Sequence, residues 1–322
     1  MKAMYADAKT GGELQFGTIP SPKAYGNNIL IEVHATSMNP HDWKYLHSGR
    51  KVYAKFSSLA KLTFPKLMLG HDVSGVIVAV GEKVNRFSVG DQVFAMSAKT
   101  GAFAEYISID QRMAAPKPAG LTHVEAATIP MASLTALQAL RMAKIKAGDN
   151  VLVIGGSGGV GIFAIQIAKA KGAKVTAVCS GKNAELVKTL GADVVVDYTK
   201  TDFHECGDVF DIVFDTVGGE TGASCKGVMV KGGNFVCTNP SRANAAEVVK
   251  TRSLALLTPD QVKAATLLAM PRGGDLREIG ELVDAGKVKT VVDKTFELSQ
   301  LQASMDYSKL GRTRGKIGIT VK

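Results

Sequence analysis

Cysteine is scarce in this chain and absent from its first half. The four cysteines among 322 residues all lie at or after Cys179, and no two form a Cys-x-x-Cys pair. That distribution argues against a disulfide framework and against a cysteine-based zinc site. We expect reduced, buried cysteines of a cytoplasmic protein.

Long apolar runs are also missing. No run approaches the roughly 20 residues that would span a membrane, and the segment from Met1 to Tyr5 lacks the apolar core of a signal peptide. We therefore expect no membrane span and a cytoplasmic location. The length leaves room for two domains.

Acidic residues are outnumbered, giving a formal net charge of +10. The stretch Lys44–Lys66 contains no Asp or Glu, and aromatic residues interleave with its basic ones. A nucleic-acid patch is one interpretation. Because no helix-turn-helix, zinc-finger or RNA-recognition signature is visible, we favour a surface loop or short helix beside a cleft that suits an anionic cofactor.

Glycine, by contrast, is concentrated where it carries information. The apolar run Val151–Ile154 breaks into Gly155-x-x-Gly158-x-x-Gly161, and apolar residues at helical spacing follow. Strand, glycine turn and helix in this order direct free backbone N–H groups and a helix dipole at an anion. The pattern predicts a dinucleotide site formed by Gly155, Ser157, Gly158, Gly159, Val160 and Gly161.

Further apolar runs follow this turn, with helix-like stretches such as Ala184–Leu190 between several of them. Strands alternating with helices indicate a parallel, doubly wound sheet. The expected strands are 151–154, 174–178, 192–196, 210–214 and 234–237.

The flanking segments differ from this α/β middle. The first 119 residues are rich in short strands and Gly turns, and a helix is expected over 123–143. After about residue 268 we expect helices over 275–284 and 298–307, with strands over 288–292 and 317–321. The chain thus divides into a β-rich head, an α/β middle and a mixed tail.

The end of the second α/β strand bears on cofactor choice. NAD-binding domains usually place Asp or Glu there, on the ribose 2′-hydroxyl. This strand instead ends in Val178-Cys-Ser-Gly-Lys182. Ser180 and Lys182 suit a 2′-phosphate through charge-assisted hydrogen bonds, so NADPH is the expected cofactor.

Motifs along the whole chain resemble the medium-chain dehydrogenase/reductase superfamily, especially its zinc-independent quinone oxidoreductase and enone reductase branch. The resembling segments are Asn39–Trp43, Gly70–Gly75, Val89–Val93, Gly101–Tyr106, Thr135–Leu140, Leu190–Asp193, Phe214–Gly218 and Gly315–Ile317.

This resemblance implies a Rossmann doubly wound parallel sheet inserted in a GroES-like β-barrel catalytic domain. The implied division is residues 1–119 for the first part of the catalytic domain, 120–268 for the Rossmann domain and 269–322 for the return. It also implies an active site in the cleft between domains, a homodimer, and cofactor contacts from Thr135 and Tyr198.

The metal that alcohol dehydrogenases of this superfamily use is not expected here. Their zinc is held by Cys, His and Cys. The positions resembling these three ligands lie in Asn39–Asp42, at His71 and at Met131, so only the histidine remains. We interpret His71 as a packed or hydrogen-bonded residue, and His41 as one that lies close to the cleft.

Without a strong Lewis acid, hydride transfer favours an already electrophilic carbon, such as a quinone or the β-carbon of an α,β-unsaturated ketone or aldehyde. Asn39 is the candidate to orient the nicotinamide ribose or the substrate oxygen, and a turn-stabilising Asn before Pro is an equal alternative. Tyr53 is the candidate donor to an enolate. Asp42 caps a helix in the alternative interpretation, and Trp43 lines a pocket or packs in the core.

Three other functions stay open. One is a degenerate alcohol dehydrogenase that holds zinc through His71 and Asp72. Another is a non-catalytic protein that binds NADPH as a stabilising ligand. The third is nucleic-acid binding through the basic surface, which predicts salt-sensitive retention of RNA or DNA.

Overall fold

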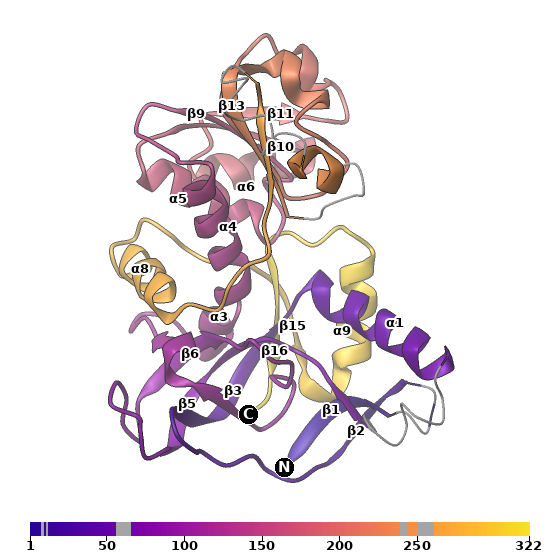
Figure 1. The fold of residues 1–322 in the computed structure, drawn as a ribbon, viewed down its shortest axis with the longest axis vertical. Coiled ribbons are helices and arrows are strands. Elements are labelled where there is room, and N and C mark those ends of the chain that lie inside the picture. The colour runs from indigo at the N-terminus through magenta and orange to yellow at the C-terminus, as the bar shows by residue number, and fades with distance from the viewer. Residues whose placement is uncertain (8–9, 11, 56–65, 239–243, 250–260) are drawn as a thin grey trace. The chain divides into compact units, whose positions relative to one another are not determined.

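The computed structural model describes residues 1–7, 10, 12–55, 66–238, 244–249 and 261–322, with the side chains of 49–55 left aside (Figure 1). It divides into two compact units. Unit 1 comprises Met1–Met131, Pro271–Asp284 and Thr290–Lys322, and unit 2 comprises Ala132–Met270 and Ala285–Lys289. No helix in the described part of the chain is long and apolar enough to cross a bilayer.

Unit 2 contains a six-stranded parallel sheet in the order β11-β10-β9-β12-β13-β14. Successive strands are added on one side of β9 up to β11 and on its other side from β12 onward. β9 leads into the glycine turn, and such a reversal is typical of dinucleotide-binding folds. Its strands are β9 (Asn150–Ile154), β10 (Lys174–Cys179), β11 (Val194–Asp197), β12 (Phe210–Asp215), β13 (Met229–Cys237) and β14 (Lys263–Thr266).

The central strands of this sheet are buried because their side chains are apolar on both faces. Leu152, Val213 and Phe235 meet in one core, at most 1% exposed. The connecting helices and turns are α5 (Gly161–Ala170), η3 (Gly181–Asn183), α6 (Ala184–Thr189), η4 (Phe203–Glu205) and η5 (Ser224–Val228).

Unit 1 is mainly antiparallel. One sheet has the order β2-β1-β4, and a second has the order β15-β16-β3-β5-β6-β8, with β7 also pairing with β3. The strands are β1 (Lys2–Asp7), β2 (Glu13–Thr18), β3 (Asn28–Met38), β4 (Lys66–Met68), β5 (Asp72–Val80), β6 (Gln92–Met96), β7 (Tyr106–Asp110), β8 (Ala114–Pro116), β15 (Val292–Glu297) and β16 (Lys316–Thr320).

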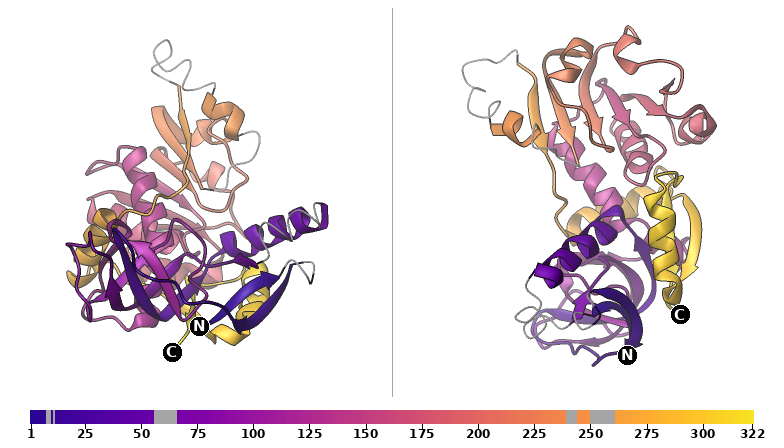
Figure 2. Two further views of the ribbon diagram at one scale, coloured as in Figure 1. Left: turned by 60° about the horizontal axis from the view of Figure 1, so that its bottom comes forward. Right: turned by 90° about the vertical axis from the view of Figure 1, so that its right-hand side faces the viewer.

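The two ends of the chain meet inside unit 1. Residues from the first strands, such as Met4 and Met38, share a core with Phe296 and Ile317 from the last ones. Figure 2 shows the C-terminal segment lying among N-terminal elements in both views. The helices and turns of this unit are α1 (Pro40–Lys55), η2 (Gln111–Met113), α3 (His123–Ala127), α8 (Gly273–Asp284), η6 (Leu298–Gln300) and α9 (Leu301–Lys309).

The helix predicted over 123–143 is two helices in the structure, α3 and α4 (Pro130–Met142). Pro130 has no N–H to donate and is favoured at a first helical position, so it ends one helix and begins the next. Unit 1 also continues past the predicted boundary at residue 119, because α3 contacts β3, β5 and β16.

One other prediction of local structure needs correction. Residues 288–291 are not a strand, because the backbone N–H and carbonyl of Lys289 bond to the Gln166 side chain, and β15 begins only at Val292.

For the basic segment 44–66, the helix alternative is confirmed as far as Lys55. Residues 56–65, which include Phe56 and Phe64, lie outside the described residues.

Candidate functional site

The glycine turn of unit 2 needs two of its glycines for the course of its backbone. Gly155 has a φ of +83°, which favours glycine, and a side chain there would also meet Thr216 Oγ1 at 2.6 Å. A Cβ on Gly161 would overlap the carbonyl oxygen of Gly155. Both glycines are therefore needed by the fold itself.

Gly158 differs from its two neighbours. A Cβ there would meet only the Gly155 carbonyl oxygen, at 3.3 Å. The space beside Gly158 is thus not filled by other described residues. Close by, α5 begins at Gly161, and Val160 in the N-cap position makes no side-chain cap hydrogen bond. An uncapped helix start beside open space is the arrangement in which phosphate oxygens satisfy backbone donors.

Two polar side chains that were not predicted from the sequence stabilise this turn. Asn183 Nδ2 donates to Ser157 Oγ at 2.9 Å, which joins the turn to the segment after β10. Thr216 Oγ1 donates to the carbonyl of Ile154 at 2.8 Å, which joins it to the end of β12. Neither residue belongs to the glycine pattern, so only the parallel strand order could have indicated them.

The predicted 2′-phosphate residues lie at the carboxyl ends of β10 and β11. Ser180 is half-buried, Lys182 is exposed, and Tyr198 is 55% exposed with its N–H donating to the Cys179 carbonyl at 3.2 Å. Strand pairing places Cys179 opposite Asp197, so the structure brings these side chains to one corner of the sheet.

That corner also contains a carboxylate that the prediction for β10 missed. Asp197 lies against Gly181 from the neighbouring strand. Hydrogen bonds from the Thr199 side chain and backbone lower the pKa of Asp197, so the carboxylate is charged. The positive charge of Lys200 contributes to the same lowering.

Thr135, the other predicted cofactor contact, lies on α4 and is 8% exposed. Its side chain is therefore largely buried. Thr135 belongs to the part of α4 that lies in unit 2.

Unit 1 contains a buried polar cluster around the carboxylate of Asp72, which is fully buried. Asp72 Oδ2 accepts hydrogen bonds from Ser37 Oγ at 2.6 Å and Asn39 Nδ2 at 2.8 Å. Its other oxygen accepts from the backbone N–H of Met131 at 2.8 Å. Lys316 Nζ lies 3.8 Å from Asp72 Oδ2 and donates to Asn39 Oδ1.

This cluster changes the interpretation of Asn39. Its side chain was predicted to orient the ribose or the substrate oxygen, but it is 4% exposed, and its two polar ends contact Asp72 and Lys316. In the structure Asn39 therefore connects a buried acid to a buried base.

Asp42 caps α1, as the alternative interpretation expected. Its Oδ2 accepts from the backbone N–H of Asn39 at 2.8 Å, while its Oδ1 is buried with no hydrogen bond to a described residue. Burial raises the pKa of Asp42 to about 6. Burial likewise lowers the pKa of Lys316, against the opposing effect of Asp72.

His71 is a packed, hydrogen-bonded residue. Its Nδ1 lies 3.0 Å from the carbonyl oxygen of Ser97, so Nδ1 carries the proton. Its Nε2 is buried without a partner among the described residues, and the His41 ring lies 5.2 Å away. Trp43 is half-buried and packs against the unit 1 core. The backbone of Tyr53 lies in α1, but its side chain falls outside the described ones.

Of the positions that resemble the zinc ligands of alcohol dehydrogenases, Asn39 and Met131 both donate hydrogen bonds to Asp72. Zinc needs at least three thiolate, imidazole or carboxylate donors. Here the two Asp72 oxygens accept four contacts, and one of them comes from a lysine ammonium. The residues present therefore do not fit a zinc ion at this place.

Comparison with known proteins agrees with both units. The family described as "Alcohol dehydrogenase GroES-like domain" matches residues 26–119, and the one described as "Zinc-binding dehydrogenase" matches residues 190–318. The chain is 37% identical to mouse "NAD(P)H oxidoreductase RTN4IP1, mitochondrial", over 92% of this chain and 82% of that protein.

Two further relatives bear on the chemistry. The chain is 33% identical to the tomato "2-methylene-furan-3-one reductase", over 92% of this chain and 73% of that protein. The quinone oxidoreductase from Coxiella burnetii has a TM-score of 0.83 and 31% identity, with 100% of this chain and 99% of that chain covered. The chain belongs to the medium-chain dehydrogenase/reductase superfamily, in its quinone-oxidoreductase-like branch.

This membership confirms the expected fold class, a Rossmann sheet together with a GroES-like domain. The relatives also support an oxidoreductase that uses a nicotinamide cofactor and a small-molecule substrate. The cytoplasmic location stays a prediction, since several relatives are named mitochondrial or chloroplastic.

Proposed function

We propose that this chain is a zinc-independent, NADPH-dependent reductase that transfers a hydride to quinones or to the C=C bond of α,β-unsaturated ketones and aldehydes. The observation that carries the proposal is the Asp72 cluster. The place where related alcohol dehydrogenases hold a Lewis acid is filled here by Asn39 and the Lys316 ammonium. Substrates that need no such polarisation are therefore favoured.

In this proposal the glycine turn holds the cofactor. Backbone N–H groups at the uncapped start of α5 bind the pyrophosphate in the space beside Gly158, and Ser157 is kept in place by Asn183. Ser180, Lys182 and Tyr198 hold the 2′-phosphate. NADPH, when bound, supplies the hydride from its nicotinamide ring.

The proposed reaction balances with one hydride and one proton. An enone gains the hydride at its β-carbon and the proton at its α-carbon, and a quinone gains both to become a hydroquinone. Tyr53 remains the proposed donor to the developing oxyanion, which hydrogen bonding stabilises. Asn39 acts in this scheme as a positioning residue, because its side-chain amide holds Asp72 and Lys316 in place.

The first experiment follows the absorbance of NADPH and of NADH with a short enone, a long enone, an alkenal and a quinone, with and without a chelator. A simple alcohol is tested in the reverse direction. We expect rapid oxidation of NADPH by an enone or quinone, unchanged by the chelator. Bound NADPH without turnover would favour the non-catalytic alternative, and loss of activity on chelation would favour a metal-dependent enzyme.

Cofactor preference is tested with Lys182→Ala. Loss of one charge-assisted hydrogen bond, worth about 1.5–3 kcal/mol, should raise KM for NADPH at least tenfold and leave KM for NADH nearly unchanged. Lys188→Ala is the matched control, because Lys188 is an exposed lysine in the last turn of α6, whereas Lys182 lies in η3 before that helix. Equal effects of Lys182→Ala on both cofactors would show that this lysine does not bind the 2′-phosphate.

We also propose a homodimer, on the basis of family resemblance. Light scattering after size-exclusion chromatography tests it, and a mass near 33.9 kDa would show a monomer instead.

A further inference from the structure

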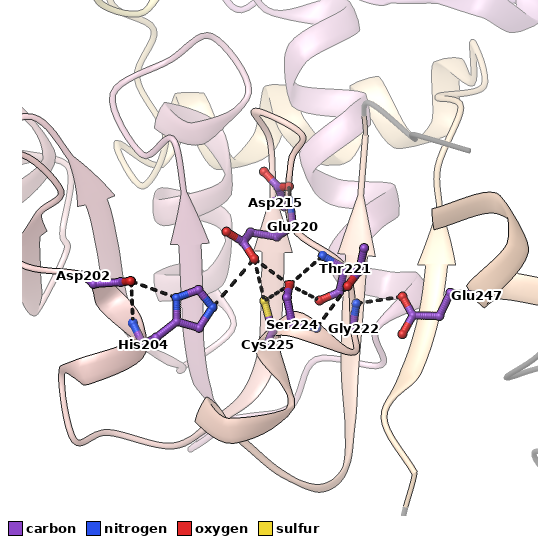
Figure 3. A network of polar contacts seen from close by, with 9 residues as sticks. All are labelled: Asp202, His204, Asp215, Glu220, Thr221, Gly222, Ser224, Cys225 and Glu247. Atoms are coloured by element: carbon purple, nitrogen blue, oxygen red, sulfur yellow. Dashed lines mark hydrogen bonds and ion pairs between the residues drawn. The ribbon is translucent and has the colours of Figure 1, made fainter. Parts of the chain in front are cut away.

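A second polar cluster lies in unit 2, in the segments that precede and follow β12 (Figure 3). It combines His204 of η4, Glu220 in the turn after β12, and Cys225 of η5. Each offers one atom, and these three atoms lie within 4.8 Å of one another. Among the described residues no other group of His, Cys, Asp and Glu meets in this way.

The histidine is oriented by a carboxylate. Asp202 Oδ1 lies 2.8 Å from His204 Nδ1 and also accepts from the His204 backbone N–H at 3.0 Å. Asp202 thus orients the ring with Nδ1 toward its own carboxylate, and Nε2 points toward Glu220 Oε2, 3.7 Å away. A carboxylate behind a histidine is the usual support of a metal-binding imidazole.

Glu220 and Cys225 face the same point. Cys225 Sγ lies 3.9 Å from Glu220 Oε2, and the thiol is fully buried. Ser224 Oγ donates to Glu220 Oε2 at 2.6 Å, and the Glu220 backbone N–H lies 3.3 Å from Asp215 Oδ2. The carboxylate therefore has a fixed position at the end of β12.

The spacing suits a tetrahedral ion. Ligand distances of about 2.0–2.3 Å place neighbouring donor atoms roughly 3.3–3.8 Å apart. The separations of 3.7 and 3.9 Å lie within or just above that range, and the third, between the ligand atoms of His204 and Cys225, is at most 4.8 Å. Nitrogen, oxygen and sulfur together match zinc and cobalt better than magnesium or calcium, which prefer oxygen alone.

We propose that His204 Nε2, Glu220 Oε2 and Cys225 Sγ form a binding site for a zinc-type divalent cation, with solvent as the fourth ligand. This site differs from the position around His71 where alcohol dehydrogenases of the superfamily hold zinc. A bound ion would tie η4, the turn after β12 and η5 together, so its role is to stabilise unit 2. The proposal does not depend on the reaction catalysed.

Charge supports the assignment. A thiolate and a carboxylate would neutralise a divalent cation, and the Asp202 carboxylate would stabilise the histidine that ligates it. A metal binds cysteine as the thiolate, so binding at this site should release the thiol proton.

The test uses purified full-length protein, stripped with a chelator and titrated with Co²⁺. We expect one ion per chain, the intense visible bands of tetrahedral cobalt, and a near-ultraviolet thiolate-to-cobalt band. Zn²⁺ should displace the cobalt and remove both features. The Cys225→Ser variant should lose the thiolate band, and Asp202→Asn should weaken binding about 10–100-fold.

Cys206→Ser is the matched control. Cys206 is a half-buried cysteine next to η4 that contributes no atom to the group, so its variant should keep the cobalt spectrum. Glu220→Gln retains an acceptor for Ser224 and should weaken metal binding while circular dichroism stays unchanged.

Two results would overturn the proposal. Absence of tetrahedral cobalt bands in the wild-type protein would mean that the cluster is a hydrogen-bond network alone. A thiolate band that persists in Cys225→Ser, or disappears in Cys206→Ser, would place the ion elsewhere.

Discussion

Replacing Lys316 with methionine should destabilise unit 1 far more than the loss of an ordinary surface lysine. Lys316 is 3% exposed and lies 3.8 Å from the fully buried carboxylate of Asp72. Methionine retains most of the aliphatic stem but removes the ammonium. The variant leaves Asp72 without its buried cation and Asn39 Oδ1 without its donor.

The size of the effect follows from this burial. Breaking a buried ion pair from one side costs about 3–5 kcal/mol, because the remaining charge is uncompensated. With a urea m-value of about 2–3 kcal/mol/M, the midpoint of the unit 1 transition should fall by roughly 1–2 M. Urea denaturation followed by circular dichroism and tryptophan fluorescence measures it, since the single tryptophan, Trp43, reports on unit 1.

The matched control is Lys309→Met. Lys309 pairs with Asp306 at 3.0 Å on the surface, with both side chains more than 40% exposed, so its loss should cost less than about 1 kcal/mol. The double variant Lys316→Met/Asp72→Asn should recover part of the lost stability, because it removes the uncompensated charge. Equal losses for Lys316→Met and Lys309→Met, or no recovery in the double variant, would refute the reasoning.

Three further predictions follow, one for Asp42 and two for the glycine turn. The pKa of Asp42 is raised to about 6, so its contribution to stability is complete below about pH 4 and is lost as the pH rises through 6. Unfolding free energies of Asp42→Asn relative to wild type should therefore rise by about 1–3 kcal/mol between pH 4 and pH 8; a pH-independent difference would contradict the raised pKa. In the turn, Gly161→Ala should lower the thermal unfolding temperature of unit 2, because its Cβ overlaps the Gly155 carbonyl oxygen. Gly158→Val should abolish NADPH binding and leave the fold intact, as the space beside it is open; unchanged affinity by fluorescence titration would mean that the pyrophosphate does not lie there.

The parallel strands of unit 2 could be predicted closely because buried strands are continuous apolar runs bounded by turns. The predicted run at 151–154 is β9, and the run at 210–214 is β12. Shorter edge strands such as β4 and β14 lack that contrast and were not expected. Periodicity alone predicts one helix over 123–143, whereas Pro130 separates it into α3 and α4.

The site was less accessible from the sequence, since its decisive contacts are distant along the chain. Lys316 and Asn39 are 277 residues apart, and no local pattern indicates that they meet. The position of Asp197 beside the end of β10 could not be predicted for a similar reason: Asp197 is the last residue of β11 and lies next to β10 only because the two strands pair. Local patterns reveal elements and turns, whereas the partners of buried charges depend on topology.

The position of β16 has a consequence for biosynthesis. Along β3, residues 28–32 pair with β7, whereas residues 35–38 pair with β16, which is translated after every strand of unit 2. Until Thr320 emerges, that half of β3 presents an unpaired edge to its surroundings. The strands of unit 2 are all translated earlier, so this internal domain can complete its sheet during synthesis. Residues 35–38 thus gain this pairing only after unit 2 has been translated, and a chain truncated before β16 would carry a folded unit 2 beside an incomplete sheet with an exposed edge.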